Sequence, residues 1–250
     1  MRSGMAARNT IGRFWLRFNP KTVRPISRSS ESSSPDQERS PSFRGEKLER
    51  RALRNEAAVI FMAGHETTAN LTSWTLFVLS EQRELQDRVA DEAAAALAAG
   101  ADAGLPGRLP LLRAVVDETL RLYPPVPRFD REAVAADRIG EHDVRPGDLV
   151  SIWPWIIHRH RQLWTEPDAF DPDRFARGCG SDRHRFQYLP FGAGPRTCVG
   201  ARFATAEALA ILAVWLRRWR FAPTPGRPVR PAGMVTLRQA GGLPLILVPR

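Results

Sequence analysis

The segment FGAGPRTCVG, residues 191–200, places one of the two cysteines of the chain in a glycine-rich loop, directly before a long apolar stretch. A thiolate at the start of a buried helix is stabilised by free backbone N–H groups and by the helix dipole, and the nearby Arg196 adds positive charge. The glycines of the segment let the backbone approach a flat ligand and direct its amides at the sulfur. Cys198 is therefore a candidate ligand.

A loop of this kind suits a cysteine that stays anionic as the axial ligand of haem iron. For a cysteine taken alone, a buried structural role is the alternative interpretation. The neighbours of Cys198 favour the ligand, because a purely structural thiol needs neither the glycines nor the adjacent arginine.

The positive charge of the chain is concentrated at its N-terminal end. Residues 1–45 contain nine basic and three acidic side chains, which account for +6 of the formal net charge of +10. They are rich in Ser, Arg and Pro and lack periodicity, as in a disordered tail or a linker of unrelated sequence. The remainder, residues 46–250, is only mildly basic, so we expect no nucleic acid partner. Two cysteines do not make a disulfide framework, and this favours a cytoplasmic location.

Residues 46–250 have a mainly helical pattern with a minor sheet, so we expect a mainly α fold with minor β structure. Hydrophobic periodicity and helix-stop signals predict four helices, at residues 46–82, 84–99, 109–122 and 199–219. Short apolar runs bounded by turn residues predict strands in two segments, residues 126–157 and the paired strands of residues 228–249.

The window of residues 57–79 is apolar and long enough to cross a bilayer, but its centre holds the polar run His65, Glu66, Thr67, Thr68 and Asn70. Polar groups at that depth are expensive in lipid. We therefore expect no transmembrane anchor, and we expect a buried helix with a polar functional bend near the central polar residues.

Five positions of the cysteine segment match the F-x-x-G-x-R-x-C-x-G signature, and by these positions the chain resembles the cytochromes P450. They are Phe191, Gly194, Arg196, Cys198 and Gly200. The resemblance implies the C-terminal portion of the P450 fold, haem b as the cofactor, and Cys198 as the axial ligand of the haem iron. It also implies that Phe191, Gly192 and Gly200 contact the cofactor.

The run AGHETT, residues 63–68, resembles the oxygen-binding bend of that family. The resemblance implies that Ala63 leaves room beside the cofactor, and that Glu66 and Thr67 are the catalytic acid–alcohol pair. Splitting an O–O bond heterolytically requires delivered protons while the thiolate donates electron density from the opposite side. A threonine-rich kink without a catalytic role is the alternative.

Glu118 and Arg121 lie at positions i and i+3 of a predicted helix, where they can form an ion pair. Such a pair is usually a solvated surface pair. Together with Arg174 in PDRF, it resembles the buried Glu–Arg–Arg triad of the family, which the resemblance implies is structural.

Two arginines are candidates for the haem propionates, because planar forked donors suit carboxylates. Arg196 matches by its place in the cysteine loop, and Arg131 resembles the propionate arginine that follows the third helix, with Arg128 as its rival. His158 and His160 lack the further ligands that a zinc site needs, so we assign no zinc.

The resemblance covers residues 46–250, the C-terminal half of the family fold. It implies a haem-thiolate monooxygenase that inserts one oxygen atom from O2 into a small organic substrate. Electrons would come from an external ferredoxin or flavoprotein reductase, because the chain has no flavin or iron–sulfur motif. The alternative is a truncated, non-catalytic remnant with weak or no haem binding.

Overall fold

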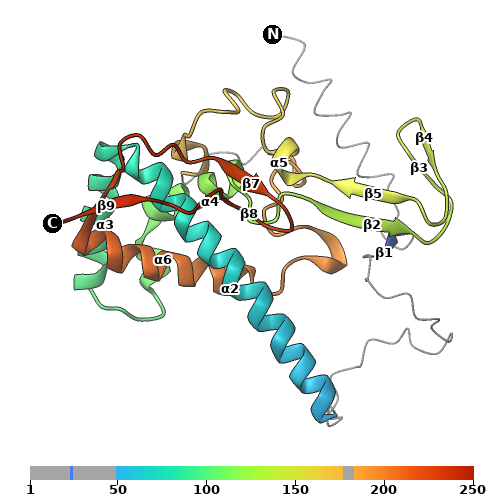
Figure 1. The fold of residues 1–250 in the computed structure, drawn as a ribbon, viewed down its shortest axis with the longest axis horizontal. Coiled ribbons are helices and arrows are strands. Elements are labelled where there is room, and N and C mark those ends of the chain that lie inside the picture. Colours follow the sequence, from blue (N-terminus) through green and yellow to red (C-terminus); the bar gives the residue numbers. More distant parts are fainter. Residues whose placement is uncertain (1–22, 25–48, 177–182) are drawn as a thin grey trace.

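The computed structural model describes residues 23–24, 49–176 and 183–250 (Figure 1). Within the predicted tail, residues 1–45, only Val23–Arg24 is described. This pair of residues forms strand β1, which pairs antiparallel with β2 (Phe129–Ala133). The rest of the prediction for the tail lies outside the described residues.

The four predicted helices are present. They are α2 (Arg50–Ser80), α3 (Arg83–Ala98), α4 (Pro110–Leu122) and α6 (Ala201–Arg218), with a short helix α5 (Pro154–Ile157) and the 3-10 turns η2 (Leu105–Arg108), η3 (Pro172–Phe175) and η4 (Gly194–Arg196). The start of α4 is held from α3, because the Glu92 carboxylate accepts hydrogen bonds from the backbone N–H groups of Leu111 and Leu112 at 2.7 and 2.8 Å. Proline at the first position of α4 needs no such partner.

The core lies between α3, α4, α6 and the second half of α2. Its fully buried side chains are mostly leucine, valine and alanine, which pack without polar atoms. They include Leu71, Leu79, Val89, Leu112, Val115, Leu209, Leu212 and Leu216. Burial on all four helices makes this bundle the rigid support for the segments that connect them.

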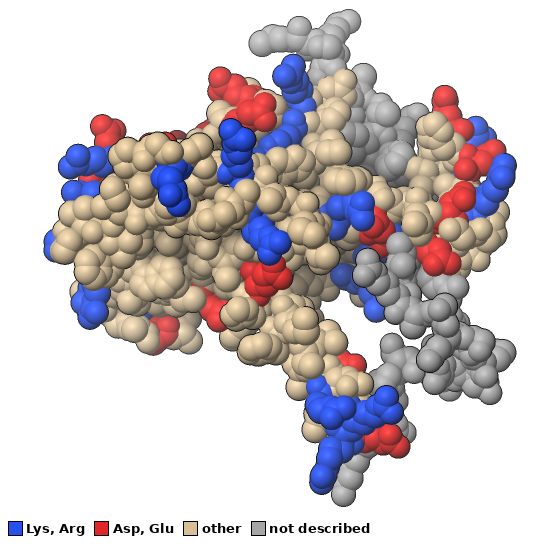
Figure 2. Space-filling model, viewed as in Figure 1, with Lys and Arg blue, Asp and Glu red and all other residues tan. Residues whose placement is uncertain are grey.

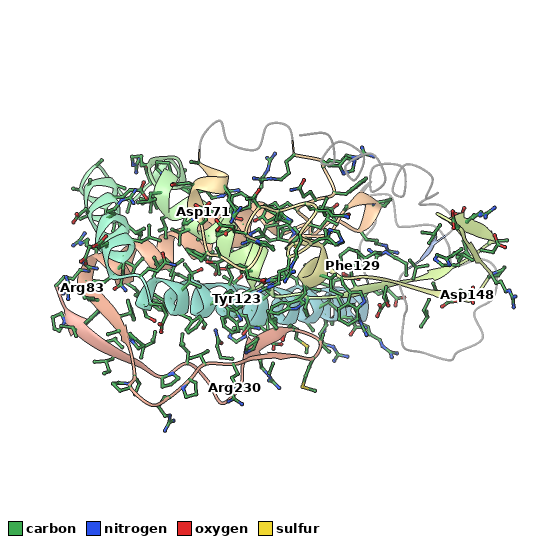
Figure 3. All side chains as sticks on the ribbon, turned by 90° about the horizontal axis from the view of Figure 1, so that it is seen from above. Arg83, Tyr123, Phe129, Asp148, Asp171 and Arg230 are labelled. Carbon is green, nitrogen blue, oxygen red and sulfur yellow. The ribbon has the colours of Figure 1, made fainter. Side chains whose placement is uncertain are left out.

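The strands form pairs around the bundle. β2 pairs with β5 (Leu149–Ile152), β3 (Asp137–Ile139) with β4 (His142–Val144), β6 (Trp219–Pro223) with β9 (Leu245–Pro249), and β7 (Pro231–Gly233) with β8 (Leu237–Gln239), all antiparallel. In Figure 3, Phe129 lies close to the helices, whereas Asp148 lies at the far end of the projecting β2–β5 pair.

The prediction for residues 228–249 was only partly right. β7 and β8 pair within that segment, but β9 pairs with β6, which lies outside it and directly follows α6. The backbone N–H of Arg250 donates to the carbonyl of Arg218 at 3.0 Å, which extends this pairing to the end of the helix. The apolar run of β9 thus lies beside the strand that follows α6 and does not pair with its neighbours β7 and β8.

The prediction of a buried helix with a bend was wrong for the first half of α2. Helix α2 is unbroken, and its residues before Thr67 are almost all exposed, including Phe61 at 71% and Met62 at 73%. Figure 1 shows this half projecting away from the bundle, and Figure 2 shows basic side chains at its tip, where the sequence places Arg50, Arg51 and Arg54. The physical reason is that no described element packs on this half. No helix in the described residues is both long and apolar enough to span a membrane.

Candidate functional site

The cysteine loop is a tight turn that presents its thiol at the surface. The Cys198 N–H donates to the Phe191 carbonyl at 2.9 Å, and η4 lies inside the turn so formed. Gly192 and Gly194 have φ of 72° and 74°, a region that other residues rarely adopt. Cys198 is exposed, and a Cβ placed on Gly200 would lie 3.9 Å from its Sγ. The turn thus presents a sulfur atom that can act as a ligand to an external metal centre.

Two apolar side chains that follow Cys198 closely in the sequence are also exposed. Val199, just before α6, is fully exposed, and Phe203, in the first turn of that helix, is 72% exposed. Figure 1 shows α6 crossing α2, and the two helices are packed together. An exposed thiol beside exposed apolar side chains suits a flat, mainly apolar ligand with an electrophilic centre.

The charges of two of the predicted arginines, Arg131 and Arg196, act on each other. Burial lowers the pKa of the Arg131 guanidinium, and the positive charge of Arg196 lowers that pKa further. Arg128, the rival candidate, is instead paired with Asp130 at 3.1 Å and lies over the Trp153 ring. Two neighbouring cations repel each other unless an anion lies between them, so a pair of this kind suits the binding of carboxylates.

Glu66 and Thr67 are neighbours in the sequence but have different hydrogen-bond partners. The Thr67 hydroxyl donates to the Ala63 carbonyl at 2.7 Å, four residues back along α2. The Glu66 carboxylate accepts a hydrogen bond of 2.6 Å from the hydroxyl of Thr236, at the turn between β7 and β8. Both lie where the exposed half of α2 meets the buried half, and the buried hydroxyl of Thr68 next to them has no partner in the described part of the chain.

Glu118, Arg121 and Arg174 form one cluster. The Arg121 guanidinium binds both carboxylate oxygens of Glu118, at 2.7 and 2.8 Å, and Arg174 Nε lies 3.4 Å from Glu118 Oε1. The side chains of Glu118 and Arg121 are completely buried. Arg121 also donates to the carbonyls of Pro167 and Ala169, so the cluster connects α4 to the segment that leads into η3.

His158 is a buried residue of this region that the sequence did not distinguish. Its ring is completely buried, with Nδ1 3.1 Å from the Arg121 carbonyl and Nε2 2.7 Å from the backbone nitrogen of Leu189. Burial lowers its pKa to about 3, and the charges of Arg121 and Arg159 act in the same direction. In the sequence it is one of two histidines of an HRH run, and nothing there marks it as buried.

The low pKa of His158 predicts acid sensitivity. The folded protein keeps this ring neutral, whereas the unfolded chain takes up a proton near the ordinary pKa of 6.5. The contribution of the neutral His158 ring to the free energy of unfolding is therefore complete above pH 6.5. It is lost as the pH falls from 6.5 towards 3, at about 1.4 kcal/mol per pH unit. Urea unfolding between pH 7.5 and 4.5 measures this slope. The fall of the free energy of unfolding with pH should be less steep in His158→Gln and unchanged in the control His142→Gln, which alters an exposed histidine. Equal slopes in wild type and His158→Gln would contradict this prediction.

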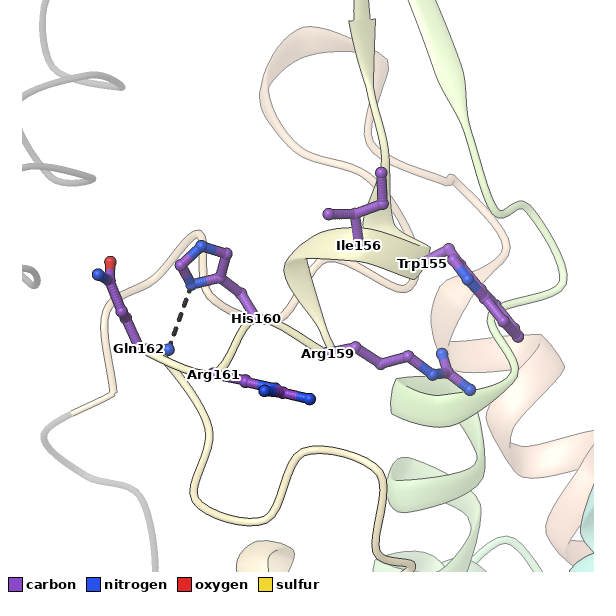
Figure 4. A pocket seen from close by; sticks show the side chains of 6 residues that line it. All are labelled: Trp155, Ile156, Arg159, His160, Arg161 and Gln162. Atoms are coloured by element: carbon purple, nitrogen blue, oxygen red, sulfur yellow. Dashed lines mark hydrogen bonds between the residues drawn. The ribbon is translucent and has the colours of Figure 1, made fainter.

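A surface pocket of about 540 Å³ lies next to α5 (Figure 4). It is lined by Trp155, Ile156, Arg159, His160, Arg161 and Gln162. The Arg159 guanidinium lies over the Trp155 ring, 3.6 Å from the ring centre. None of the predicted site residues lines this pocket, so it is separate from the cysteine loop.

An exposed thiol in a glycine turn at the start of an apolar helix, supported by a buried Glu–Arg–Arg cluster, is the arrangement of a haem-thiolate protein. The family model for Cytochrome P450 matches residues 29–241, and the chain belongs to the cytochrome P450 family. This match begins ahead of residue 46, where we placed the boundary of the resemblance.

Curated relatives and solved structures agree with this membership. The chain is 33% identical to Probable cytochrome P450 4s3 of Drosophila melanogaster, over 82% of this chain and 40% of that protein. It is 35% identical to Cyclooctatin synthase of Streptomyces melanosporofaciens, over 79% and 43%. The structure of a cytochrome P450 (CYP102L1) matches with a TM-score of 0.75 and 30% identity, over 82% of this chain and 47% of that one. The cytochrome P450DA haem domain matches with a TM-score of 0.77 and 27% identity, over 88% and 47%.

The chain therefore spans about two fifths of the length of these curated relatives and just under half of the matched structures. The fold is that of a partial cytochrome P450. Cytochromes P450 bind haem b, and the residues present fit that group: a free exposed thiol, uncovered apolar side chains beside it, and two adjacent guanidinium groups.

Proposed function

We propose that this chain provides the iron-ligating part of a haem-thiolate monooxygenase, which inserts one oxygen atom from O2 into a small organic substrate. The observation that carries the proposal is the cysteine loop, with an exposed Cys198 held by its N–H bond to Phe191. The test is the absorption spectrum of the purified, haem-supplemented protein, reduced and carbon monoxide-bound. A thiolate-type Soret band supports the proposal, and its absence refutes it.

Cys198 would bind the iron, and Arg131 and Arg196 would bind the propionates. Bound haem supplies the activation of O2, with electrons from an external ferredoxin or flavoprotein reductase. The protein contributes orientation and charge. The glycine turn fixes the sulfur, while the two guanidinium groups lose their mutual repulsion when carboxylates lie between them. Phe191, Gly192 and Gly200 would lie against the cofactor at the sulfur side, and Ala63 on the α2 side.

Glu66 and Thr67 would deliver protons to the reacting oxygen. A proton donor must exchange with solvent and also reach the reaction site, and these side chains lie at the border between the exposed and buried halves of α2. Glu66 is exposed and bonded to Thr236, so its carboxylate is in contact with water and with the β7–β8 turn. The Thr67 hydroxyl is the inner partner of the pair, because it is half-buried where Glu66 is exposed.

Thr67→Ala is expected to divert electrons from substrate oxidation to peroxide while haem binding stays near normal. Losing a proton-delivery group slows the assisted step by roughly 10²–10⁴-fold, less where water substitutes. The measurement is peroxide formed per electron pair consumed, in protein that holds haem. Thr72→Ala is the matched control, because Thr72 makes the same backward bond, to the Thr68 carbonyl at 3.0 Å, in the buried half of the helix. An unchanged peroxide fraction in Thr67→Ala would assign Thr67 another role.

One observation favours the alternative, a non-catalytic remnant. The first half of α2 is exposed, from Leu53 at 57% to Met62 at 73%, and Val199 and Phe203 are also uncovered. Water must be kept from the reacting atoms during oxygen activation. A site with so much open surface would bind haem weakly and would lack the walls that enclose a substrate.

The isolated 250-residue chain is expected to be poorly soluble, to dimerise, or to copurify with little haem. The reason is the uncovered apolar surface of α2, since large exposed apolar patches drive association. Haem per chain and the mass from size-exclusion chromatography are the measurements. A soluble monomer with stoichiometric thiolate-bound haem would contradict the expectation. If the DNA upstream of residue 1 encodes a further segment, a chain that includes this segment should bind haem at an occupancy closer to one per chain.

A further inference from the structure

His158 makes one hydrogen bond to each of two segments that the sequence separates widely. Its Nδ1 lies 3.1 Å from the carbonyl oxygen of Arg121, at the end of α4, and its Nε2 lies 2.7 Å from the backbone nitrogen of Leu189. A carbonyl oxygen only accepts and a backbone N–H only donates. Nδ1 therefore carries the proton, Nε2 accepts, and the ring is neutral.

Leu189 is the point at which the cysteine loop begins. It is buried, at 3% exposed, and it stands two residues before Phe191, whose carbonyl receives the Cys198 N–H. A continuous path thus leads from Arg121 through the His158 ring to Leu189, Phe191 and the thiol. Arg121 makes a second hydrogen bond to the same histidine, because its Nη1 donates to the His158 carbonyl at 2.8 Å.

We propose that His158 is a positioning residue that sets the place of the cysteine loop relative to the Glu118–Arg121–Arg174 cluster. This inference deepens the proposed function, since it concerns how the ligand cysteine is held. The inference depends on the direction of the two hydrogen bonds, because only a ring with its proton on Nδ1 can bond to both segments. The opposite tautomer, or a doubly protonated ring, turns an N–H towards the N–H of Leu189.

The surroundings of the ring support a single neutral tautomer. The guanidinium groups of Arg121 and Arg159 lie near it and disfavour a third positive charge, and burial lowers the pKa of the ring to about 3. The Tyr188 ring lies against it, with the ring centres 5.3 Å apart. Because Leu189 is buried, removal of the acceptor leaves its backbone N–H without a partner.

Two variants of similar polarity separate the two bonds. In His158→Gln the amide oxygen takes the place of Nε2 and accepts from Leu189, but no donor faces Arg121. In His158→Asn the amide nitrogen takes the place of Nδ1 and donates to Arg121, but the N–H of Leu189 is left alone. Both variants lose one hydrogen bond of the same kind, so a general structural role predicts equal effects.

The first measurement is amide hydrogen exchange of residues 189–198 in the protein without haem. We expect exchange at Leu189 and Cys198 to be at least tenfold faster in His158→Asn than in His158→Gln, with His160→Gln behaving as wild type. Equal rates in the Asn and Gln variants would overturn the inference.

A second measurement needs no variant. In protein labelled with ¹⁵N at histidine, His158 is expected to show a protonated Nδ1 and an unprotonated Nε2 at pH 7; a proton on Nε2 would overturn the inference even if both variants fail to fold. These readouts do not depend on haem. If the Cys198 loop responds as described but no thiolate-type spectrum forms, the proposed function fails and the positioning role stands.

Discussion

Replacement of Cys198 by alanine is expected to abolish the thiolate-type Soret band of the reduced, carbon monoxide-bound protein completely. The exposed sulfur in the glycine turn is the anionic axial donor that this spectrum requires. Cys198→His is expected to bind haem with a different spectrum, because a neutral imidazole donates less electron density. The measurement is the difference spectrum of haem-supplemented protein.

The matched control is Cys179→Ala, which removes the other cysteine of the chain. No motif surrounds Cys179, so its loss should leave the band at wild-type position and intensity. A thiolate-type band that persists in Cys198→Ala would show that the assignment of the ligand is wrong.

Glu118→Gln is expected to destabilise the protein by about 3–5 kcal/mol, because breaking a buried ion pair leaves a charge without compensation. The carboxylate is completely buried, binds Arg121 through both oxygens and also accepts the N–H of Asp171 at 2.9 Å. A loss of this size is a large share of the roughly 5–15 kcal/mol that stabilises a typical domain. Urea unfolding monitored by circular dichroism measures it.

Asp143→Asn is the control for that change. Asp143 pairs with Arg138 at 3.7 Å, but both side chains are largely exposed, at 87% and 64%. Pairs of this kind contribute about 0–1 kcal/mol. A loss in Glu118→Gln no larger than in Asp143→Asn would mean that the cluster does not hold α4 to the segment before η3.

The helices were predictable from local signals, whereas the long-range strand pairing was not. The predicted third helix ends at Leu122, as the structure has it, because Pro124 and Pro125 prevent its continuation. No local signal of that kind selects the partner of β9. Its apolar run is equally compatible with a hairpin within residues 228–249, and the pairing with β6 depends on where α6 ends.

The residues of the candidate site that lie in a sequence motif were predicted from the sequence. The sequence spacing alone identifies Glu118 and Arg121 as a pair, while the place of Arg174 beside them came from the resemblance. His158 was missed, because burial decides its role and nothing in HRH distinguishes it from His160. The exposure of Phe61 and Met62 was also not predictable, because an apolar run is buried only where another element packs on it.

Helix α2 has 31 residues, so it is about 46 Å long, yet its two halves are helical for different reasons. From Thr68 onwards, tertiary packing imposes the helical conformation. Before that point the helix depends on intrinsic propensity, which Val59, Ile60 and Gly64 weaken. Its first turn has no acidic residue and no side-chain cap, and the basic residues there oppose the helix dipole.

The length of the projecting half is therefore governed by a helix–coil equilibrium. Isolated helices shorter than about 12–15 residues are marginal in water, and the projecting segment, residues 50–66, is scarcely longer than that. Warming shortens it from Arg50 inward, and any surface that packs against Ile60 and Phe61 lengthens it. The number of helical residues at the N-terminal end of α2 therefore depends on whether another surface packs on this half, and it can be measured without any catalytic reaction.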